Sequence, residues 1–332
     1  MNPIAMIIGS HVIYWNAIVI ALGVAACFCL TMALFTAHGG RAAAIWLLLP
    51  LAIALSLPLA RFINWYCHSE KYLSFWKAMT DYSRGDYCLA GVILGTGLAG
   101  WIVYLLGFTQ NLRRLYDCLV PGAALGIAFI RLSEIFTNAD RGKAVVTNPA
   151  FQRLPFSTEI TSSGEWRIAT FFFQFLMMLV IFVLLMRFFV QRRRWPMRAG
   201  LPRDGHVALM FLSWLSALDL MADSSRYDAS FLRLNGFVSM VQIVSAVTLL
   251  AVLIIYSLRS IRVYGLRPKL VISWVVFFLA VGLTGFLEWL VQRHGNWYLS
   301  CYFLMSLSCL ALALVNYRVY LSVCGERKRK HA

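Results

Sequence analysis

Charged side chains inside an apolar segment of membrane length are the feature of this sequence that points most directly to chemistry. The stretch 121–142, PGAALGIAFIRLSEIFTNADRG, carries Arg131 and Glu134 close to one end of its apolar part. An ionisable residue in such a segment is costly to bury, and it therefore indicates a functional site with a nearby partner. Arg131 and Glu134 are three residues apart, which places them on one helix face. They predict either a site for a charged group or a neutralised pair at a polar helix end.

A second charged stripe lies further along the chain. The sequence LDLMADSSR (218–226) places Asp219, Asp223 and Arg226 at positions i, i+4 and i+7, on one face of a helix. Arginine presents a fixed fork of donors that matches phosphate oxygens in bidentate fashion. Two arginines, each with carboxylates on its own helix, therefore predict a site for the phosphate of a lipid headgroup. The alternative is a structural lattice of ion pairs between the two helices.

The elements that must position these residues are membrane-spanning helices. Of the 332 residues, 61% are hydrophobic and only 13% are charged, whereas soluble domains are about 45–50% apolar and about 25% charged. An all-α polytopic membrane protein is predicted, because apolar runs of the length that one spanning helix needs recur about nine times. The two most polar runs, 116–136 and 205–222, are expected to face the bundle interior. The predicted spans are 12–36, 43–63, 87–108, 116–136, 168–190, 205–222, 235–257, 269–291 and 298–321.

Lysine and arginine are distributed unequally between the two sets of connecting loops. The loops after the first, third, fifth and seventh spans, together with the tail, carry more of these residues than the opposite loops. Because cytoplasmic loops carry such an excess, the N-terminus is predicted to lie outside and the C-terminus in the cytoplasm. The long loops 64–86 and 137–167 then lie outside. Loops of this length are usually functional or disordered, and we expect partly ordered caps over an outward-facing cavity.

The basic clusters and the cysteines point to the membrane rather than to nucleic acid or a metal. The clusters RRRWPMR (192–198) and ERKRK (326–330) flank predicted spans, where basic residues hold anionic headgroups at about 1 kcal/mol each. No nucleic-acid partner is predicted. The eight cysteines lie mostly within or beside apolar segments and lack the spacing of zinc ligands. We therefore predict neither a metal site nor a disulfide framework.

Four blocks of the sequence resemble, in their order and spacing, the prolipoprotein diacylglyceryl transferase family. The resemblance covers roughly residues 10–260. IYWNAIVIALG (13–23) is similar to the first span of the family, and EWRIATFFFQF (165–175) stands where the family has P-x-QLYE. The segment 117–142 resembles the signature D-x-x-aP-x-x-x-x-G-x-x-x-GRxGNFxNxExxG. DLMADSSR followed by LNGFVSMVQ (219–226 and 234–242) resembles R-f-x-x-E-x-x-R and a later G-x-x-x-x-Q segment.

The resemblance implies transfer of the diacylglyceryl group of phosphatidylglycerol to the lipobox cysteine of a preprolipoprotein, without a metal or cofactor. The reaction would take place at the outer face of a bacterial cell (inner or plasma) membrane. The implied partners are phosphatidylglycerol or another anionic phospholipid and the signal peptide of the preprolipoprotein. Arg131 and Arg226 would contact the phosphate, and Gly142 would supply a backbone position near the site. The other lipid-binding residues that it implies are Asn16, Glu134, Asp219, Asp223 and Gln242.

The chain departs from the family pattern at several positions that carry charge. The HGG that precedes the third span in the family is replaced by Asp86-Tyr87-Cys88, and His38-Gly39-Gly40 lies in a different loop. A carboxylate serves as a general base when its pKa is raised, so Asp86 is expected to accept a proton in place of histidine. The other replacements are Asn16 for tyrosine, Glu134 for asparagine, Gln174 for glutamate and Asp219 for arginine.

The chain is thus expected to contain a transferase-like membrane domain of seven spans, residues 1–262, followed by two additional helices and a basic cytoplasmic tail, residues 263–332. The replaced residues leave a second function open, that of a non-catalytic descendant which binds lipid or lipoprotein. The charged stripe from Asp219 to Arg226 leaves a third, a transporter of small solutes.

Overall fold

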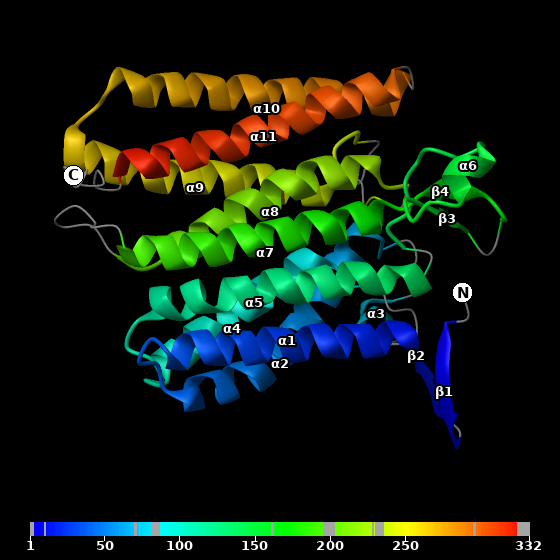
Figure 1. Cartoon of the computed structure of the whole chain (residues 1–332), viewed down its shortest axis with the longest axis horizontal. Coiled ribbons are helices and arrows are strands. Elements are labelled where there is room, and N and C mark those ends of the chain that lie inside the picture. Colours follow the sequence, from blue (N-terminus) through cyan, green and yellow to red (C-terminus); the bar gives the residue numbers. More distant parts are fainter. Residues whose placement is uncertain are drawn as a thin grey trace, which may run out of the picture.

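The structure is a computed structural model of a helical bundle whose long helices run side by side (Figure 1). It describes residues 3–9, 11–69, 72, 74–80, 87–137, 139–160, 163–194, 203–227, 229, 236–294 and 297–323. The long helices are α1 (Trp15–Thr36), α2 (Ala42–Cys67), α4 (Leu89–Leu105), α5 (Leu112–Ser133), α7 (Thr170–Arg194), α8 (His206–Ser225), α9 (Met240–Tyr264), α10 (Pro268–His294) and α11 (Tyr298–Val323). The short elements are strands β1 (Ile4–Ile8), β2 (His11–Tyr14), β3 (Ser157–Glu159) and β4 (Trp166–Ile168), helices α3 (Phe75–Thr80) and α6 (Pro149–Gln152), and the 3-10 turn η3 (Glu134–Phe136).

Each predicted span overlaps one of the long helices that the structure describes, and the number of spans remains a prediction. Within the described residues, eight of these helices are long and apolar enough to cross a membrane, and α4 is a shorter apolar helix of 17 residues. Helix α4 ends before the predicted boundary because Gly107 adopts a left-handed conformation, with φ of 77°. Its N–H group and that of Phe108 bond to carbonyls of the last helical turn, which is a common way for a helix to end. The prediction of an all-α polytopic membrane protein is confirmed.

The two most polar spans, now α5 and α8, lie in the interior of the bundle as predicted. In an apolar stretch of 18 residues, 50% of the residues of α5 and 61% of those of α8 are buried. Both shares are larger than in any other spanning helix that the structure describes. Helix α5 packs against α1, α7 and α8, while α8 packs against α7, α9 and α11. The charged ends of these two helices are therefore held inside a ring of apolar neighbours.

Small residues allow two helix pairs in the first half of the chain to approach closely. A Cβ atom added at Gly95 of α4 would lie 2.5 Å from the Cα atom of Ser56 in α2. One added at Gly122 of α5 would lie 2.7 Å from the carbonyl oxygen of Cys27 in α1. Small residues at helix contacts are typical of membrane proteins, where close backbone packing replaces the hydrophobic driving force.

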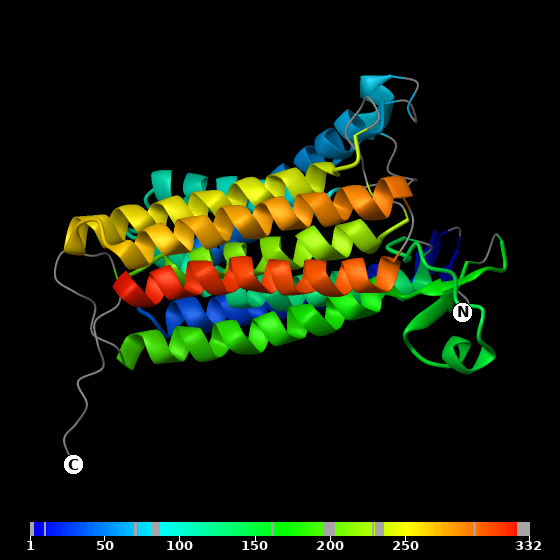
Figure 2. The same ribbon diagram turned by 90° about the horizontal axis from the view of Figure 1, so that it is seen from above.

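The C-terminal hairpin of α10 and α11 is part of the same bundle. Helix α11 packs against both α8 and α9 (Figure 2). The side-chain amide of Asn316 in α11 donates to Ser213 Oγ of α8 at 2.9 Å and to the carbonyl oxygen of Leu249 in α9 at 3.3 Å. Asn316 is fully buried. A polar link at membrane depth therefore fixes this hairpin to the helices of the predicted transferase-like domain.

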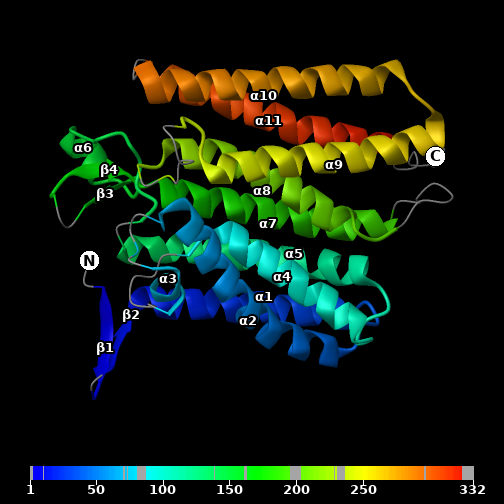
Figure 3. The same cartoon turned by 180° about the vertical axis from the view of Figure 1, so that it is seen from behind.

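The short elements gather at one end of the bundle, the end at which α5 and α8 finish (Figure 3). The loop between η3 and α7 holds α6 and the antiparallel pair of β3 and β4. Strands β1 and β2 form a separate hairpin before α1, so the first helix begins at Trp15, three residues later than predicted. Both long loops that were predicted to lie outside start from this end. Whether it faces outward remains a prediction.

Candidate functional site at the loop end of the bundle

The two arginines of the predicted site meet on one carboxylate. Arg131 lies in the last turn of α5, and Arg226 directly follows α8. Arg131 Nη1 pairs with Asp140 Oδ2, and Arg226 Nη2 pairs with Asp140 Oδ1 at 2.5 Å. Arg226 Nη1 also lies 3.7 Å from Asp223 Oδ1. The sequence predicted that each arginine would be matched by carboxylates on its own helix. Arg226 has this partner in Asp223, and in addition the carboxylate of Asp140, in the intervening loop, joins the two helices.

The backbone at Asp140 adopts a conformation that few side chains accept. Its φ is 53°, in the left-handed region, which aspartate tolerates better than most residues with a Cβ atom. The side chain is only 3% exposed, and the carbonyl oxygen accepts a hydrogen bond from the N–H of Phe171 at 3.1 Å. Unusual backbone conformations of this kind occur where the surroundings fix them, often at functional sites. Here the loop end of α7 and the two arginines fix Asp140.

Gly142 joins the loop to the end of α8. It forms an antiparallel bridge with Arg226, and the N–H of the next residue, Lys143, donates to the carbonyl oxygen of Ser225 at 2.9 Å. A Cβ atom at Gly142 would lie 3.0 Å from the Cβ of Ile168 and 3.1 Å from its carbonyl oxygen. A larger residue would therefore push the loop away from β4. This close approach explains the glycine at this position and supports the predicted backbone role.

Further carboxylates surround the arginine pair. Asp219, one turn before Asp223 on α8, interacts electrostatically with Arg131. The carboxylate of Glu134 accepts a hydrogen bond from Thr137 Oγ1 at 2.6 Å. It also interacts with Arg131 and Asp140. The site is therefore a mixed lattice of charges, in which acidic groups balance the arginines, rather than an open cationic cradle.

The appended hairpin reaches the edge of this lattice through Lys143. The ammonium group of Lys143 and the hydroxyl of Tyr302 in α11 both donate to the carbonyl oxygen of Ser224, at 3.0 and 3.3 Å. Burial lowers the pKa of Lys143, while the carboxylates of Glu288 in α10 and Asp223 in α8 raise it in part. Glu288 of α10 thus interacts electrostatically with Lys143, the residue next to Gly142, and Tyr302 of α11 shares a hydrogen-bond acceptor with it.

Three other predicted site residues either form hydrogen bonds with groups other than the two arginines or lie outside the described residues. The side-chain oxygen of Asn16 accepts a hydrogen bond from the N–H of Ala17 at the start of α1. Gln242 forms a capping box with Ser239 at the start of α9 and donates to the carbonyl oxygen of Leu220 at 3.3 Å. Asp86, the predicted proton acceptor, lies outside the described residues. The lipid-binding roles of Asn16 and Gln242 remain predictions.

Sequence reasoning missed Asp140 and Arg141. In the family signature quoted above, the carboxylate that follows GRxGNFxN aligns with Ala139 of this chain, and an aspartate comes one residue later. That displaced acidic residue was a signal that the sequence offered. Arg141 occupies a position that the signature leaves unspecified. Its importance depends on its burial, because the side chain is only 2% exposed.

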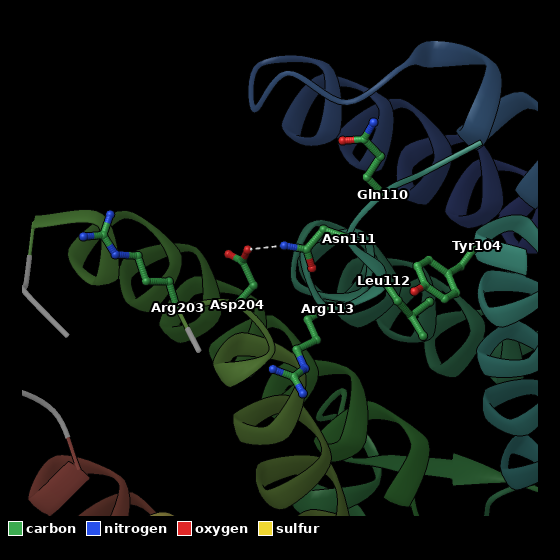
Figure 4. Close-up of a pocket in the computed structure, with 7 residues that line it drawn as sticks. All are labelled: Tyr104, Gln110, Asn111, Leu112, Arg113, Arg203 and Asp204. Atoms are coloured by element: carbon green, nitrogen blue, oxygen red, sulfur yellow. Dashed lines mark hydrogen bonds between the residues drawn. The ribbon is translucent and has the colours of Figure 1, made fainter. Parts of the chain in front are cut away.

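The opposite end of the bundle carries different polar features. A cavity of about 440 Å³ opens beside the loop between α4 and α5, and Asn111 Nδ2 donates to Asp204 Oδ2 there at 2.7 Å (Figure 4). Asp117 of α5 accepts hydrogen bonds from the N–H groups of Gly205 and Ala208 at 2.7 and 3.0 Å. It therefore caps the start of α8. The cavity is lined by Tyr104, Gln110, Asn111, Leu112, Arg113, Arg203 and Asp204.

Comparison with known proteins places the chain in a family. A family model described as prolipoprotein diacylglyceryl transferase matches residues 3–258, which include the arginine pair, Asp140 and Gly142 but leave out α10 and α11. No curated protein matches the chain. Members of the matched family act on lipids and preprolipoproteins in membranes. The match covers most of the chain, and the protein therefore belongs to the prolipoprotein diacylglyceryl transferase family.

Proposed function

We propose that this protein transfers the diacylglyceryl group of phosphatidylglycerol to the lipobox cysteine of a preprolipoprotein, at the outer face of a bacterial plasma membrane. The observation that carries the proposal is that Arg131 and Arg226 both pair with one carboxylate, that of Asp140. Two guanidinium groups held by different helices are suited to bind phosphate oxygens. The family supplies the class of substrate.

In the proposed step, the thiol sulfur of the acceptor cysteine attacks the glyceryl carbon that carries the phosphate. A carbon–sulfur bond forms, and the carbon–oxygen bond to the phosphate breaks with its electron pair left on the departing glycerol phosphate. The thiol proton passes to a carboxylate, for which we propose Asp86. Fixed donors stabilise the negative charge of the leaving group, and this is the role proposed for Arg131 and Arg226.

Asp140 sets a condition on this mechanism, because its carboxylate already occupies one donor nitrogen of each arginine. A guanidinium group has five N–H donors. Each arginine is therefore able to hold a phosphate oxygen while it keeps Asp140, and the carboxylate then serves to orient the two forks. The other residues proposed to line the lipid site are Asn16, Glu134, Gly142, Asp219, Asp223 and Gln242.

The proposal is tested by complementation of a bacterial strain depleted of its own diacylglyceryl transferase. The wild-type chain is expected to restore growth and lipoprotein modification, while Arg131→Ala and Arg226→Ala are expected to fail at equal membrane levels. Arg153→Ala is the matched control, since Arg153 is an exposed arginine of the loop between η3 and α7. Rescue by Arg131→Ala as complete as that by the wild type would show that the arginine pair does not carry the reaction.

A second function, binding without catalysis, is favoured by the carboxylates of the lattice. Glu134 and Asp219 stand where the family pattern has neutral and cationic residues, and both interact with Arg131. They weaken the cationic field that a phosphate meets. A wild-type chain that binds lipid and lipoprotein but gives no rescue would favour this function over the first.

A further inference from the structure

Arg141 is a buried arginine whose hydrogen-bonding groups are only partly used. It lies between Asp140 and Gly142, and its side chain is only 2% exposed. Nη2 donates to the carbonyl oxygen of Thr137 at 2.5 Å, and the guanidinium group lies 5.4 Å from the centre of the Phe171 ring. Nε and Nη1 are buried and have no hydrogen-bond partner in the described part of the chain. Two of its three nitrogen atoms are thus left without an acceptor.

Such an arrangement is unfavourable unless another group completes it. Burial of a charge without a partner costs free energy, and buried polar groups in native proteins are almost always hydrogen-bonded to protein, water or a ligand. Burial lowers the pKa of Arg141, and the charges of Glu134 and Tyr227 raise it only in part. Arginine nevertheless stays protonated in proteins. Its donors therefore require an acceptor that the described part of the chain does not provide.

The neighbouring arginines differ from Arg141 in that each is paired with a carboxylate, although the buried Nε of Arg167 also has no hydrogen-bond partner among the described residues. Arg131 and Arg226 both pair with Asp140. Arg167, on β4, pairs with Glu165 at 2.9 Å. The described part of the chain places no carboxylate within ion-pair distance of Arg141, although all of these side chains lie around the same loop. Among these four arginines, Arg141 is thus the one for which the described residues supply no carboxylate partner.

The open donors belong to the same polar region as the arginine pair. The carboxylate of Glu134 interacts with Arg141 and also with Arg131 and Arg226. Thr137 connects the two residues, because its hydroxyl donates to Glu134 and its carbonyl oxygen accepts from Arg141. Tyr227, which follows Arg226, donates its N–H to the carbonyl oxygen of Arg141 at 2.9 Å. Arg141 is therefore connected by hydrogen bonds and electrostatic interactions to the residues around the arginine pair, where a bound ligand is proposed to lie.

We propose that Arg141 is a third binding residue of this site and that its open N–H groups donate hydrogen bonds to oxygen atoms of a phosphate-bearing anion. Phosphate oxygens suit these donors because hydrogen bonds between two ionised groups are short and strong. The inference rests on the proposed function for the identity of the ligand as a lipid headgroup. Free phosphate carries the same chemistry. In either case Arg141 supplies the cationic charge that Glu134 and Asp219 remove from the family pattern.

The test compares thermal unfolding of the full-length wild type and of Arg141→Met in neutral detergent, with and without added ligand. Methionine keeps an apolar stem against Phe171 and removes the charge. Without ligand, Arg141→Met is expected to unfold at the same temperature as the wild type or higher, because a buried unpaired charge is gone. In mixed micelles with phosphatidylglycerol, the midpoint of the wild type rises, and this rise is expected to be lost in Arg141→Met. Arg153→Met should behave like the wild type.

Additional arms identify the source of the anion and separate this inference from the proposed function. The apparent affinity for phosphatidylglycerol should fall about 10- to 100-fold in Arg141→Met, as expected for lost hydrogen bonds to a charged group. Inorganic phosphate in place of the lipid shows whether a free anion is sufficient, and diacylglycerol shows whether the phosphate is needed. Binding that depends on Arg141 without transfer to a lipobox peptide would support this inference and contradict the proposed function.

Two results would overturn the inference. One is a phosphatidylglycerol-dependent rise of the unfolding midpoint that is as large in Arg141→Met as in the wild type. The other is an equal rise with diacylglycerol, since the phosphate would then contribute nothing. If Arg141→Met does not fold, Arg141→Lys keeps the charge but offers fewer donors. It should then show weakened binding of phosphatidylglycerol with unchanged stability in the absence of ligand, and unweakened binding would count against the inference.

Discussion

At the scale of single residues, Asp140 determines how the two site arginines are held. Its carboxylate pairs with Arg131 from α5 and with Arg226 from the end of α8. Arg131 is 12% exposed, Arg226 19% and Asp140 3%, so these pairs lie largely out of water. Loss of one partner from a buried ion pair is strongly destabilising because it leaves the other charge uncompensated.

Asp140→Asn is therefore expected to lower the free energy of unfolding by about 3 kcal/mol. Two guanidinium groups would lose their common anion while the volume of the side chain stays nearly the same. The measurement is detergent-based unfolding of the purified protein at neutral pH. Asp204→Asn is the control, since Asp204 pairs with an arginine that is 46% exposed, and such a pair contributes about 1 kcal/mol or less. Equal effects of the two substitutions would contradict the role given to Asp140.

Lys143 makes the stability of the loop dependent on pH. Burial lowers the pKa of its ammonium group in the folded protein, whereas the unfolded chain has an ordinary value of about 10.4. Between the two values the unfolded state binds more protons, so stability from this group rises with pH. The unfolding temperature of the wild type relative to Lys143→Gln should therefore increase as the pH rises toward the ordinary lysine pKa of about 10.4. A constant difference as the pH rises would show that Lys143 is not buried in this way.

The sequence indicated the arginine pair but not the residues that complete it. Arg131 and Arg226 were recognisable because charge is rare in apolar segments. Asp140 and Arg141 lie in a polar loop, where charged residues are ordinary, and their burial depends on backbone pairing between residues 141–143 and 225–227. Long-range pairing of this kind leaves no periodic pattern in a sequence.

At the scale of elements, the C-terminal hairpin is joined to the helices that hold the site. Helices α10 and α11 lie beyond the residues that the family model matches. Asn316 links α11 to α8 and α9 at membrane depth, and Tyr302 reaches the last turn of α8. The sequence predicted the two helices from their apolar length. Their contact with the site follows from side chains that the hydropathy pattern does not distinguish.

Asn316→Leu is expected to weaken the docking of this hairpin by about 1 kcal/mol, the usual size of a side-chain hydrogen bond between membrane helices. Leucine has a similar volume, so packing is largely kept. Unfolding of Asn316→Leu in detergent should begin at a lower concentration of denaturant than unfolding of the wild type. Asn111→Leu, a similar change outside the membrane-spanning core at the other end of the bundle, provides a comparison. An unchanged transition for Asn316→Leu would show that packing alone holds the hairpin.

At the scale of the whole molecule, the bundle separates two polar ends. The loop end gathers Arg131, Arg226, Asp140 and Gly142 from three segments of the chain, and the opposite end carries the cavity beside Asn111. The polarity of α5 and α8 was sufficient to predict that they lie inside the bundle. The least apolar spans gain the most free energy when protein neighbours rather than lipid surround them. The family match covers residues of both ends.

The most direct test of the account is a reconstituted transfer assay. The purified protein is incubated with phosphatidylglycerol vesicles and a peptide that carries a lipobox cysteine, and both products are measured by mass spectrometry. We expect a thioether-linked diacylglyceryl peptide with one glycerol phosphate released for each peptide modified, and about 100-fold slower transfer by Arg226→Ala. An unmodified peptide in the presence of folded wild-type protein that binds phosphatidylglycerol would contradict it.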